Sequence, residues 1–180
     1  AVEIYNHGCA NGCDRPDGFG IADLLLTEGR KLTLIATDDA HFYEPDHFGG
    51  WVMVKATENT PEALLSALKR GDFYSSQGPE IRDVRIEGDK AIVECSSASS
   101  VIAIGWGTGA RGVHGHSMTR AEVPLDRLLG SPWIRISVID AAGKFVLKCD
   151  NGQDGAPLGK HKVTLIDNNL NSEDEPGKPG

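Results

Sequence analysis

The sequence is short of the features that direct a protein to membranes or to nucleic acids. None of its apolar runs approaches the length of a membrane-spanning helix, and no signal peptide is visible. Basic residues are the minority, with 18 lysines and arginines against 26 aspartates and glutamates and a net charge of −8. Because general binding to nucleic acids or anionic membranes requires a basic patch, we expect neither kind of partner.

Cysteine is scarce as well. The four cysteines are Cys9, Cys13, Cys95 and Cys149, and their spacing matches no disulfide framework. We therefore expect reduced thiols and a cytoplasmic protein. His7 joins the first two cysteines in an H-x-C-x3-C cluster, but C-x3-C is looser than the usual C-x2-C zinc motif and no second ligand pair follows. The spacing therefore does not favour a structural zinc site.

The main chemical feature is an apolar stretch that ends abruptly in two carboxylates and an imidazole. Residues 32–37 are rich in Leu, Ile and Thr and carry no acidic or basic side chain, which predicts a buried strand. Asp39 and His41 follow, two positions apart, so in an extended backbone their side chains point to the same side. Such a pair suits zinc, manganese or iron. Asp38 would then point away or orient His41. The alternative is a strand-end turn with Asp39 as a cap and His41 on the surface.

Residues 1–79 are predicted to form an α/β unit. The expected elements around the strand at 32–37 are strands at 1–6, 51–56 and 73–76, a Gly- and Asp-rich loop at 8–18, and helices at 20–28 and 61–70. Strand, helix and strand at short spacing are typical of a parallel α/β unit. Three or four strands are too few to close a barrel, so we expect that a preceding N-terminal part belongs to the same protein.

Residues 80–166 are predicted to be β-rich. Five or six short strands with turns between them favour a small β-sandwich. The Gly-, His- and Arg-rich stretch at 107–117 is predicted to be a surface loop, which would include the H-x-H letters at His114 and His116. The polar residues 167–180 should form a disordered tail. The oligomeric state does not follow from the sequence.

Three stretches together resemble a known family. Residues 3–6 (EIYN), 35–41 (IATDDAH) and 67–81 (ALKRGDFYSSQGPEI) are similar, in order and spacing, to the C-terminal part of PHP-domain metal-dependent hydrolases. The most similar branch contains carbaryl-type ester hydrolases and bacterial phosphoesterases. The resemblance covers most of residues 1–95 and continues more weakly through the β-rich part.

The resemblance implies both a fold and a metal site. Residues 1–79 would be the C-terminal part of a distorted (β/α)7 barrel, followed by a small β-sandwich-like unit. The family binds two or three divalent ions (Zn, Mn or Fe), and its final D-x-H ligand motif corresponds to Asp39 and His41. The family's N-terminal ligands have no counterpart here, so this fragment alone should be inactive. The expected pocket or orienting residues, with Asp38, are Glu3, Asn6 and His7.

The resemblance also implies a function. The family's default reaction is hydrolysis of small phosphate esters by a metal-activated water, and carboxylic or carbamate esters are substrates in this branch. No residue can be assigned as the general acid. The alternative is a non-catalytic fragment whose β-sandwich is a binding or adhesion module, for example for sugars.

Overall fold

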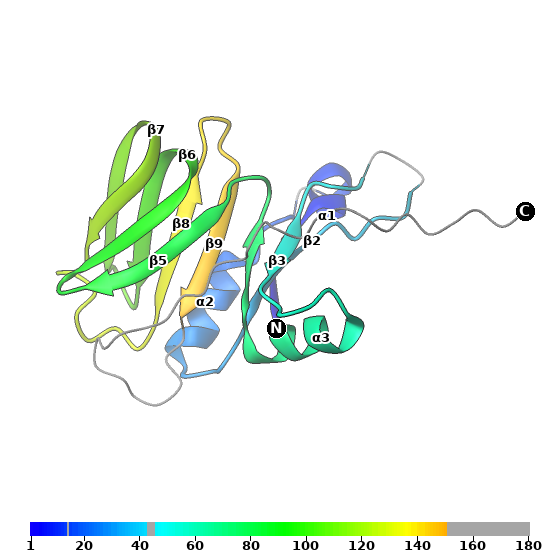
Figure 1. The fold of residues 1–180 in the computed structure, drawn as a ribbon, viewed down its shortest axis with the longest axis horizontal. Helices are drawn as coiled ribbons and strands as arrows, with labels where there is room; N and C mark the ends of the chain where they lie inside the picture. Colours follow the sequence, from blue (N-terminus) through cyan, green and yellow to red (C-terminus); the bar gives the residue numbers. More distant parts are fainter. Residues whose placement is uncertain (14, 43–45, 151–180) are drawn as a thin grey trace, which may run out of the picture.

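The fold is seen in a computed structural model, which describes residues 1–13, 15–42 and 46–150 (Figure 1). The predicted tail at 167–180 lies outside the described residues, as does the end of the unit predicted at 80–166. The elements of the described part are β1 (Val2–Asn6), α1 (His7–Gly12), α2 (Phe19–Thr27), β2 (Leu34–Thr37), β3 (Trp51–Val54), α3 (Pro61–Arg70), β4 (Phe73–Ser76), β5 (Ile81–Glu87), β6 (Lys90–Gly105), β7 (Ala110–Pro124), β8 (Ile134–Ile139) and β9 (Phe145–Asp150).

Seven strands form one sheet in which all the pairings are antiparallel, in the order β3-β4-β9-β8-β6-β5, with β7 also paired to β6. The first half of β6 pairs with β5 and with the end of β7, and its second half pairs with the start of β7 and with β8. The β6–β7 register shifts between Glu94 and Ser100, as at a β-bulge. The long β6–β7 hairpin can be followed at one end of the sheet in Figure 1.

The core of this sheet draws its residues from β5, β6, β7, β8 and β9. Small and β-branched side chains line it, since these fit a pleated surface. Val93, Val101, Val123 and Val138 have no exposed surface, and Leu125 closes the cluster from the turn after β7. These residues come from three strands and one turn, so the β-rich part has a hydrophobic core of its own.

The barrel prediction is wrong. Among the described residues only β1 and β2 form a parallel pair, whereas β3 pairs antiparallel with β4, and β4 pairs antiparallel with β9. The outer edge of β1 is also occupied, because Asn6 N–H donates to Pro16 C=O at 3.0 Å and Gly18 N–H donates to Ile4 C=O at 3.2 Å. A third parallel strand has no place at that edge, so the described residues form a β-rich fold with a short α/β appendage.

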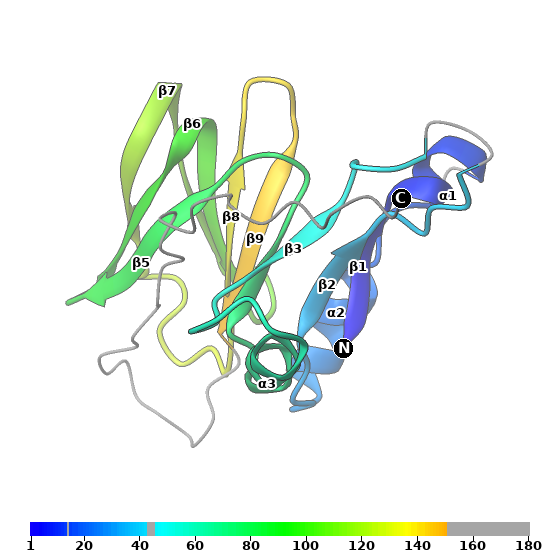
Figure 2. The same ribbon diagram turned by 45° about the vertical axis from the view of Figure 1, so that its right-hand side comes forward.

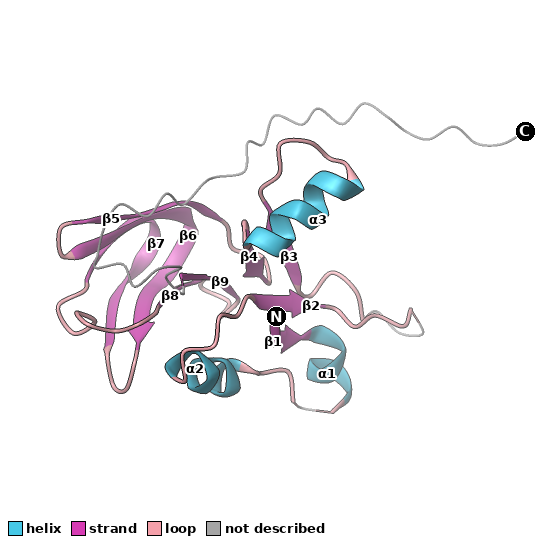
Figure 3. Ribbon diagram, turned by 90° about the horizontal axis from the view of Figure 1, so that it is seen from below, coloured by secondary structure: helices cyan, strands magenta, loops and turns pink. Residues whose placement is uncertain are grey.

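The β1–β2 pair is attached to the large sheet by buried contacts. Ile4 and Leu34 pack with Leu147 of β9 in one apolar cluster. The Ser75 hydroxyl on β4 donates to the carbonyl of Leu34 on β2 at 2.8 Å. Figure 3 shows α2 on one side of β1–β2 and the antiparallel β3–β4 pair with α3 on the other. The large sheet therefore runs across the domain boundary predicted at residue 79.

A charged pair also fixes α2 to β8. Arg135 is buried on β8, and its guanidinium donates two hydrogen bonds to the carboxylate of Asp23 on α2, at 3.0 and 2.7 Å. The same guanidinium lies 4.9 Å from the ring centroid of Phe19. Two parallel N–H···O bonds and an aromatic face are the contacts that a planar guanidinium favours.

Two helices form where the sequence predicts them. The Thr60 hydroxyl caps α3 by accepting from Ala63 N–H, and Gly71 ends it at a φ of 78°. α2 lies close to the predicted 20–28. The loop prediction at 8–18 is wrong in its first half, because α1 forms there with Asn6 as its cap. Along the described part of the chain, no helix is long and apolar enough to cross a membrane.

The loop prediction at 107–117 is also wrong, because most of this stretch lies in β7. His114 faces Ser100 across the β6–β7 ladder, and the serine Oγ lies 2.9 Å from His114 Nδ1. His116 lies where the register shifts, next to Ser117, whose φ is 50°. Both imidazoles are exposed on an edge strand.

Candidate functional site

The candidate site lies where β1 and β2 end together. Asn6 and Thr37 are register partners at the ends of these parallel strands, so the residues that follow emerge at the same edge. Asp38 and Asp39 follow β2, and His7 follows β1. In Figure 2, α1 lies at this end of the β1–β2 pair, beside the chain that leaves β2. Asp38, Asp39 and His7 therefore lie at the same edge of the β1–β2 pair.

Glu3, Asn6 and Asp39 form a polar cluster at this edge. The Asn6 side-chain amide donates to Glu3 Oε2 and to Asp39 Oδ2, both at 3.2 Å. The Thr37 hydroxyl donates to the other oxygen of Glu3. Asn6 Oδ1 accepts from Cys9 N–H at 2.7 Å. Asn6 is 8% exposed, whereas both carboxylates are exposed. One buried amide thus holds two accessible carboxylates near each other.

The backbone from Asp39 to His41 is not extended, although the predicted metal pair requires an extended backbone there. Asp39 has a φ of 52°, in the left-handed region, so the chain turns directly after β2. His41 N–H donates to Asp46 Oδ2 at 2.8 Å, and His41 Nδ1 lies 3.9 Å from the same oxygen. The hydrogen bond from the His41 amide lowers the pKa of Asp46, with a smaller lowering effect from Phe42 N–H. The imidazole of His41 is therefore placed beside Asp46.

Asp38 anchors the segment that leads into β3. Its carboxylate accepts from the backbone N–H groups of Phe48, Gly49 and Gly50 at 2.6, 2.8 and 2.8 Å. Burial raises the pKa of Asp38, but the three amides together outweigh it, so its pKa lies below the ordinary value. The prediction that Asp38 orients His41 finds no support in these contacts, since both of its oxygens are used by the 48–50 backbone.

His7 lies beside the same segment. Its Nδ1 is 3.1 Å from the Tyr5 hydroxyl, and its Nε2 is 3.3 Å from the Asn11 amide nitrogen. The ring packs against Gly49, where an added Cβ would come within 2.1 Å of it. Both ring nitrogens therefore have neighbours, and the residue fixes the position of the 48–50 backbone relative to α1.

The potential metal-binding atoms at this edge are two carboxylate oxygens, one from Glu3 and one from Asp39, which both accept from the Asn6 amide. This chemistry suits a hard or borderline divalent cation. In residues 1–13, 15–42 and 46–150, however, no group of three or more His, Cys, Asp or Glu side chains is placed to hold a metal ion. Glu3 and Asp39 therefore do not by themselves make up such a group.

Sequence reasoning missed the roles of Thr37 and Asp46. Thr37 was visible only as the last residue of a strand, and its link to Glu3 needs the β1–β2 register, which no local pattern gives. Asp46 closes a turn around His41 and Phe42 by accepting from both amides. The usual turn rule, in which Asp accepts from an amide about two residues further on, does not predict these contacts, because the amides lie four and five positions before Asp46.

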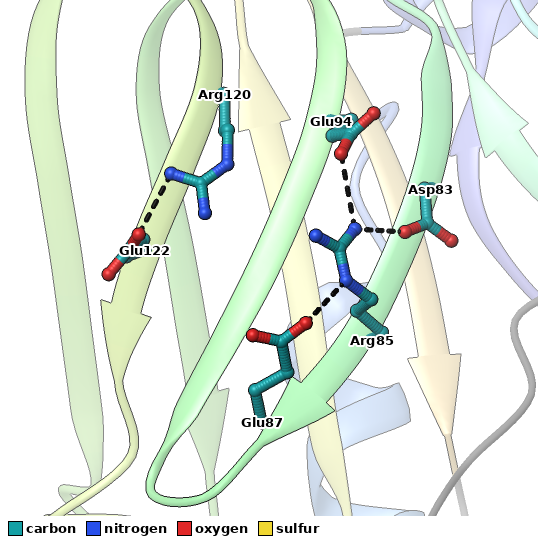
Figure 4. A network of polar contacts seen from close by, with 6 residues as sticks. All are labelled: Asp83, Arg85, Glu87, Glu94, Arg120 and Glu122. Carbon is teal, nitrogen blue, oxygen red and sulfur yellow. Dashed lines mark hydrogen bonds and ion pairs between the residues drawn. The ribbon is translucent and has the colours of Figure 1, made fainter.

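Two further features lie away from the β1–β2 edge, a charged cluster on the large sheet and an open groove. Figure 4 shows Arg85 between the carboxylates of Asp83, Glu87 and Glu94, with an Arg120–Glu122 pair on β7. These three carboxylates, with Glu87 first, hold the pKa of Arg85 above its usual value. Since β5 is the last strand of its sheet, this charged face protects an edge from pairing with another chain.

The other feature is an open groove of about 270 Å³ between α2 and the turn after β6. Leu24, Thr27, Trp106 and Trp133 line it together with Asp23. Trp106 is 59% exposed and Leu24 is 56% exposed. Trp133 Nε1 donates to the Thr27 hydroxyl at 3.3 Å, which holds one wall of the groove against α2.

Comparison with known proteins adds no relative to these observations: no family model, curated protein or solved structure matches the chain.

Proposed function

We propose that this chain is part of a metal-dependent hydrolase of the PHP type that cleaves phosphate esters through a metal-activated water. The observation that carries the proposal is the convergence of Glu3 and Asp39 on the Asn6 amide at the carboxyl ends of two parallel strands. Ligands in parallel α/β sheets bind at this end of the strands. The proposal concerns the chemistry of this edge and requires no barrel.

Each residue of the cluster has a role in the proposal. Asp39 and Glu3 would hold a divalent cation through exposed oxygens. His41, the nitrogen ligand expected from the D-x-H motif, lies beside Asp46 and would join them only after its side chain turns away from that carboxylate. Asn6 and Thr37 would orient the two carboxylates, as hydrogen-bond partners of metal ligands generally do. A bound divalent ion lowers the pKa of water and neutralises charge that develops on a phosphoryl oxygen. Because two carboxylates are fewer ligands than catalytic sites use, further ligands would come from outside the described residues.

The test is phosphatase activity of the natural polypeptide that carries this sequence, measured with p-nitrophenyl phosphate and Mn²⁺ or Zn²⁺. We expect hydrolysis that chelators abolish and that falls by about 100-fold in Asp39→Ala, because a metal ligand is lost. Lys90→Ala, at the start of β6 in the β-rich part, is the matched control and should leave the rate unchanged. Metal-dependent activity that is equal in Asp39→Ala and the unmodified protein would refute the proposal.

A second candidate function is a sugar-binding or adhesion module, and the groove beside Trp106 favours it. An exposed indole gives a flat apolar surface of the kind on which a sugar ring can stack, and Leu24 extends that surface. We expect soluble oligosaccharides to quench the fluorescence of Trp106 and Trp106→Ala to abolish the response. Trp51→Phe is the control, since Trp51 lies on β3 away from the groove. An unchanged emission spectrum across a broad panel of sugars would remove this candidate.

A further inference from the structure

The helix α1 places two thiols one turn apart. Cys9 lies within α1 and Cys13 directly follows it, with Cys13 N–H donating to Cys9 C=O at 3.0 Å. Residues four apart along a helix are about one turn apart, and Cys13 lies near enough to Cys9 to raise the pKa of its thiol. Both cysteines are free, Cys9 half-buried and Cys13 exposed. The pair is therefore accessible to a ligand from solvent.

The backbone under these thiols is fixed by polar contacts. Asn6 Oδ1 accepts from Cys9 N–H at 2.7 Å, and Gly8 N–H donates to the carbonyl of Asp38 at 2.8 Å. None of the six residues of α1 is buried. The helix therefore contributes little to the hydrophobic core, so changing the cysteines should not open a cavity in it.

The spacing of the pair suits chelation better than a disulfide. Cβ atoms one helical turn apart lie about 5–6 Å from each other, whereas a disulfide needs about 4 Å. Cys13 keeps the helical hydrogen bond of its N–H to Cys9 C=O, although as the C-cap it has a φ of −140°. A metal ion placed between two sulfurs, with bonds of about 2.3 Å to each, spans the longer separation. Two ligands at i and i+4 on one helix face are also the arrangement that H-E-x-x-H zinc sites use.

The charges around Cys9 favour a cation. The pKa of Cys9 is raised by its hydrogen bond to Cys13 first, and also by burial and by the negative charges of Asp39 and Glu3. These carboxylates therefore act on the thiol through space. A thiolate formed next to two carboxylates is costly by itself, and a divalent cation would offset that repulsion.

We propose that Cys9 and Cys13 form a bidentate binding site for a soft divalent cation of the Zn²⁺ or Cd²⁺ class. As each sulfur–metal bond forms, the thiol releases its proton to solvent. In the described part of the chain no third His, Cys, Asp or Glu joins the pair in a metal-holding group. Water or a small free thiol therefore fills the remaining two positions, and the ion is exchangeable. The proposal does not depend on the hydrolase function, because its ligands are sulfurs and not the carboxylates.

The test is a Cd²⁺ titration of the full chain, followed by the ultraviolet charge-transfer absorption of cadmium–thiolate bonds. We expect a saturable band that halves or disappears in Cys9→Ser and in Cys13→Ser. Cys149→Ser is the control, and the band should be unchanged in it. Excess Mn²⁺, which prefers oxygen ligands, should not displace Cd²⁺.

Circular dichroism of both serine variants guards against loss of the fold, which we do not expect because α1 has no buried side chain. The Glu3→Gln variant keeps both thiols and should bind Cd²⁺ about tenfold more weakly, because a neighbouring charge is lost. A band that survives in the Cys9→Ser, Cys13→Ser double variant, or its absence from the unmodified chain, would overturn the proposal.

Discussion

At the scale of single residues, the site depends on carboxylates that accept backbone hydrogen bonds. Asp38 and Asp46 each accept two or more N–H groups from the segment between β2 and β3. Phe42 and Phe48 in this segment have φ values of 60°, which is unusual for residues with large side chains. The carboxylates therefore hold a backbone conformation that the local sequence does not favour.

This arrangement gives a pH prediction for Asp38. Its pKa is lower in the folded protein than in the unfolded chain, so its contribution to stability is complete above the unfolded pKa near 3.8 and is lost as the pH falls through the lower folded value. We expect hydrogen-exchange protection of the Phe48, Gly49 and Gly50 amides at neutral pH and its loss in strong acid. Amide exchange followed by NMR measures this directly.

The matched variant is Asp38→Asn, which keeps the size of the side chain and removes its charge. Protection of the 48–50 amides should fall at neutral pH, while the His41 amide, held by Asp46, should keep its own. Equal protection of the 48–50 amides in the variant and in the unmodified protein would show that the carboxylate is not their anchor.

At the scale of elements, local signals and long-range pairings differ in what the sequence can predict. α3 is predictable because Thr60, Pro61 and Gly71 specify its two ends. The Glu3–Asn6–Asp39 cluster is only partly predictable, because Asp39 follows a clear strand but its contact with Asn6 depends on the β1–β2 register. Asn6 and Asp39 are 33 positions apart, and no periodic pattern encodes such a contact.

The predicted fold class is wrong because it also depends on strand pairings between distant parts of the sequence. β4 pairs with β9, with Ser75 opposite Leu147, and this pairing decides between an antiparallel sheet and a parallel barrel. The composition of the short strands β3 and β4 fits a parallel and an antiparallel sheet equally well, so it does not distinguish the two. Likewise, the glycines and histidines in 107–117 do not form a recognisable strand pattern, so β7 was not predicted there. It forms by pairing with β6.

The link between α2 and β8 supplies a prediction at this scale. Asp23→Ala would leave the guanidinium of Arg135 buried and unpaired, since that side chain is only 7% exposed. We expect the free energy of unfolding to fall by about 2–3 kcal/mol, somewhat less than for a fully buried pair because Asp23 reaches solvent. Urea denaturation measures the change.

The control is the double variant Asp23→Leu, Arg135→Met, which removes both charges and keeps apolar volume. It should recover most of the lost stability, because an apolar pair carries no desolvation cost. A double variant as unstable as Asp23→Ala would mean that packing of α2, and not the buried charge, sets the loss.

At the scale of the whole molecule, the question is whether the part before residue 79 unfolds separately from the β-rich part. Leu147 of β9 connects the two parts, because it is 1% exposed and packs in the apolar cluster that contains Ile4, Ala22 and Leu34. The strand that carries Leu147 also pairs with β4 and β8. A core shared in this way couples the two parts of the chain.

We therefore expect one cooperative unfolding transition, with NMR signals of Ala36 on β2 and Val93 on β6 disappearing at the same urea concentration. Leu147→Ala should lower the stability reported by both signals by about 3 kcal/mol, since it opens a cavity between the two parts. Val93→Ala, in the other core, should also move both signals together if unfolding is cooperative. Two separate midpoints, with Leu147→Ala moving only one of them, would instead show that residues 1–79 unfold as an independent domain. In that case the contacts of Leu147 would not couple the unfolding of the two cores.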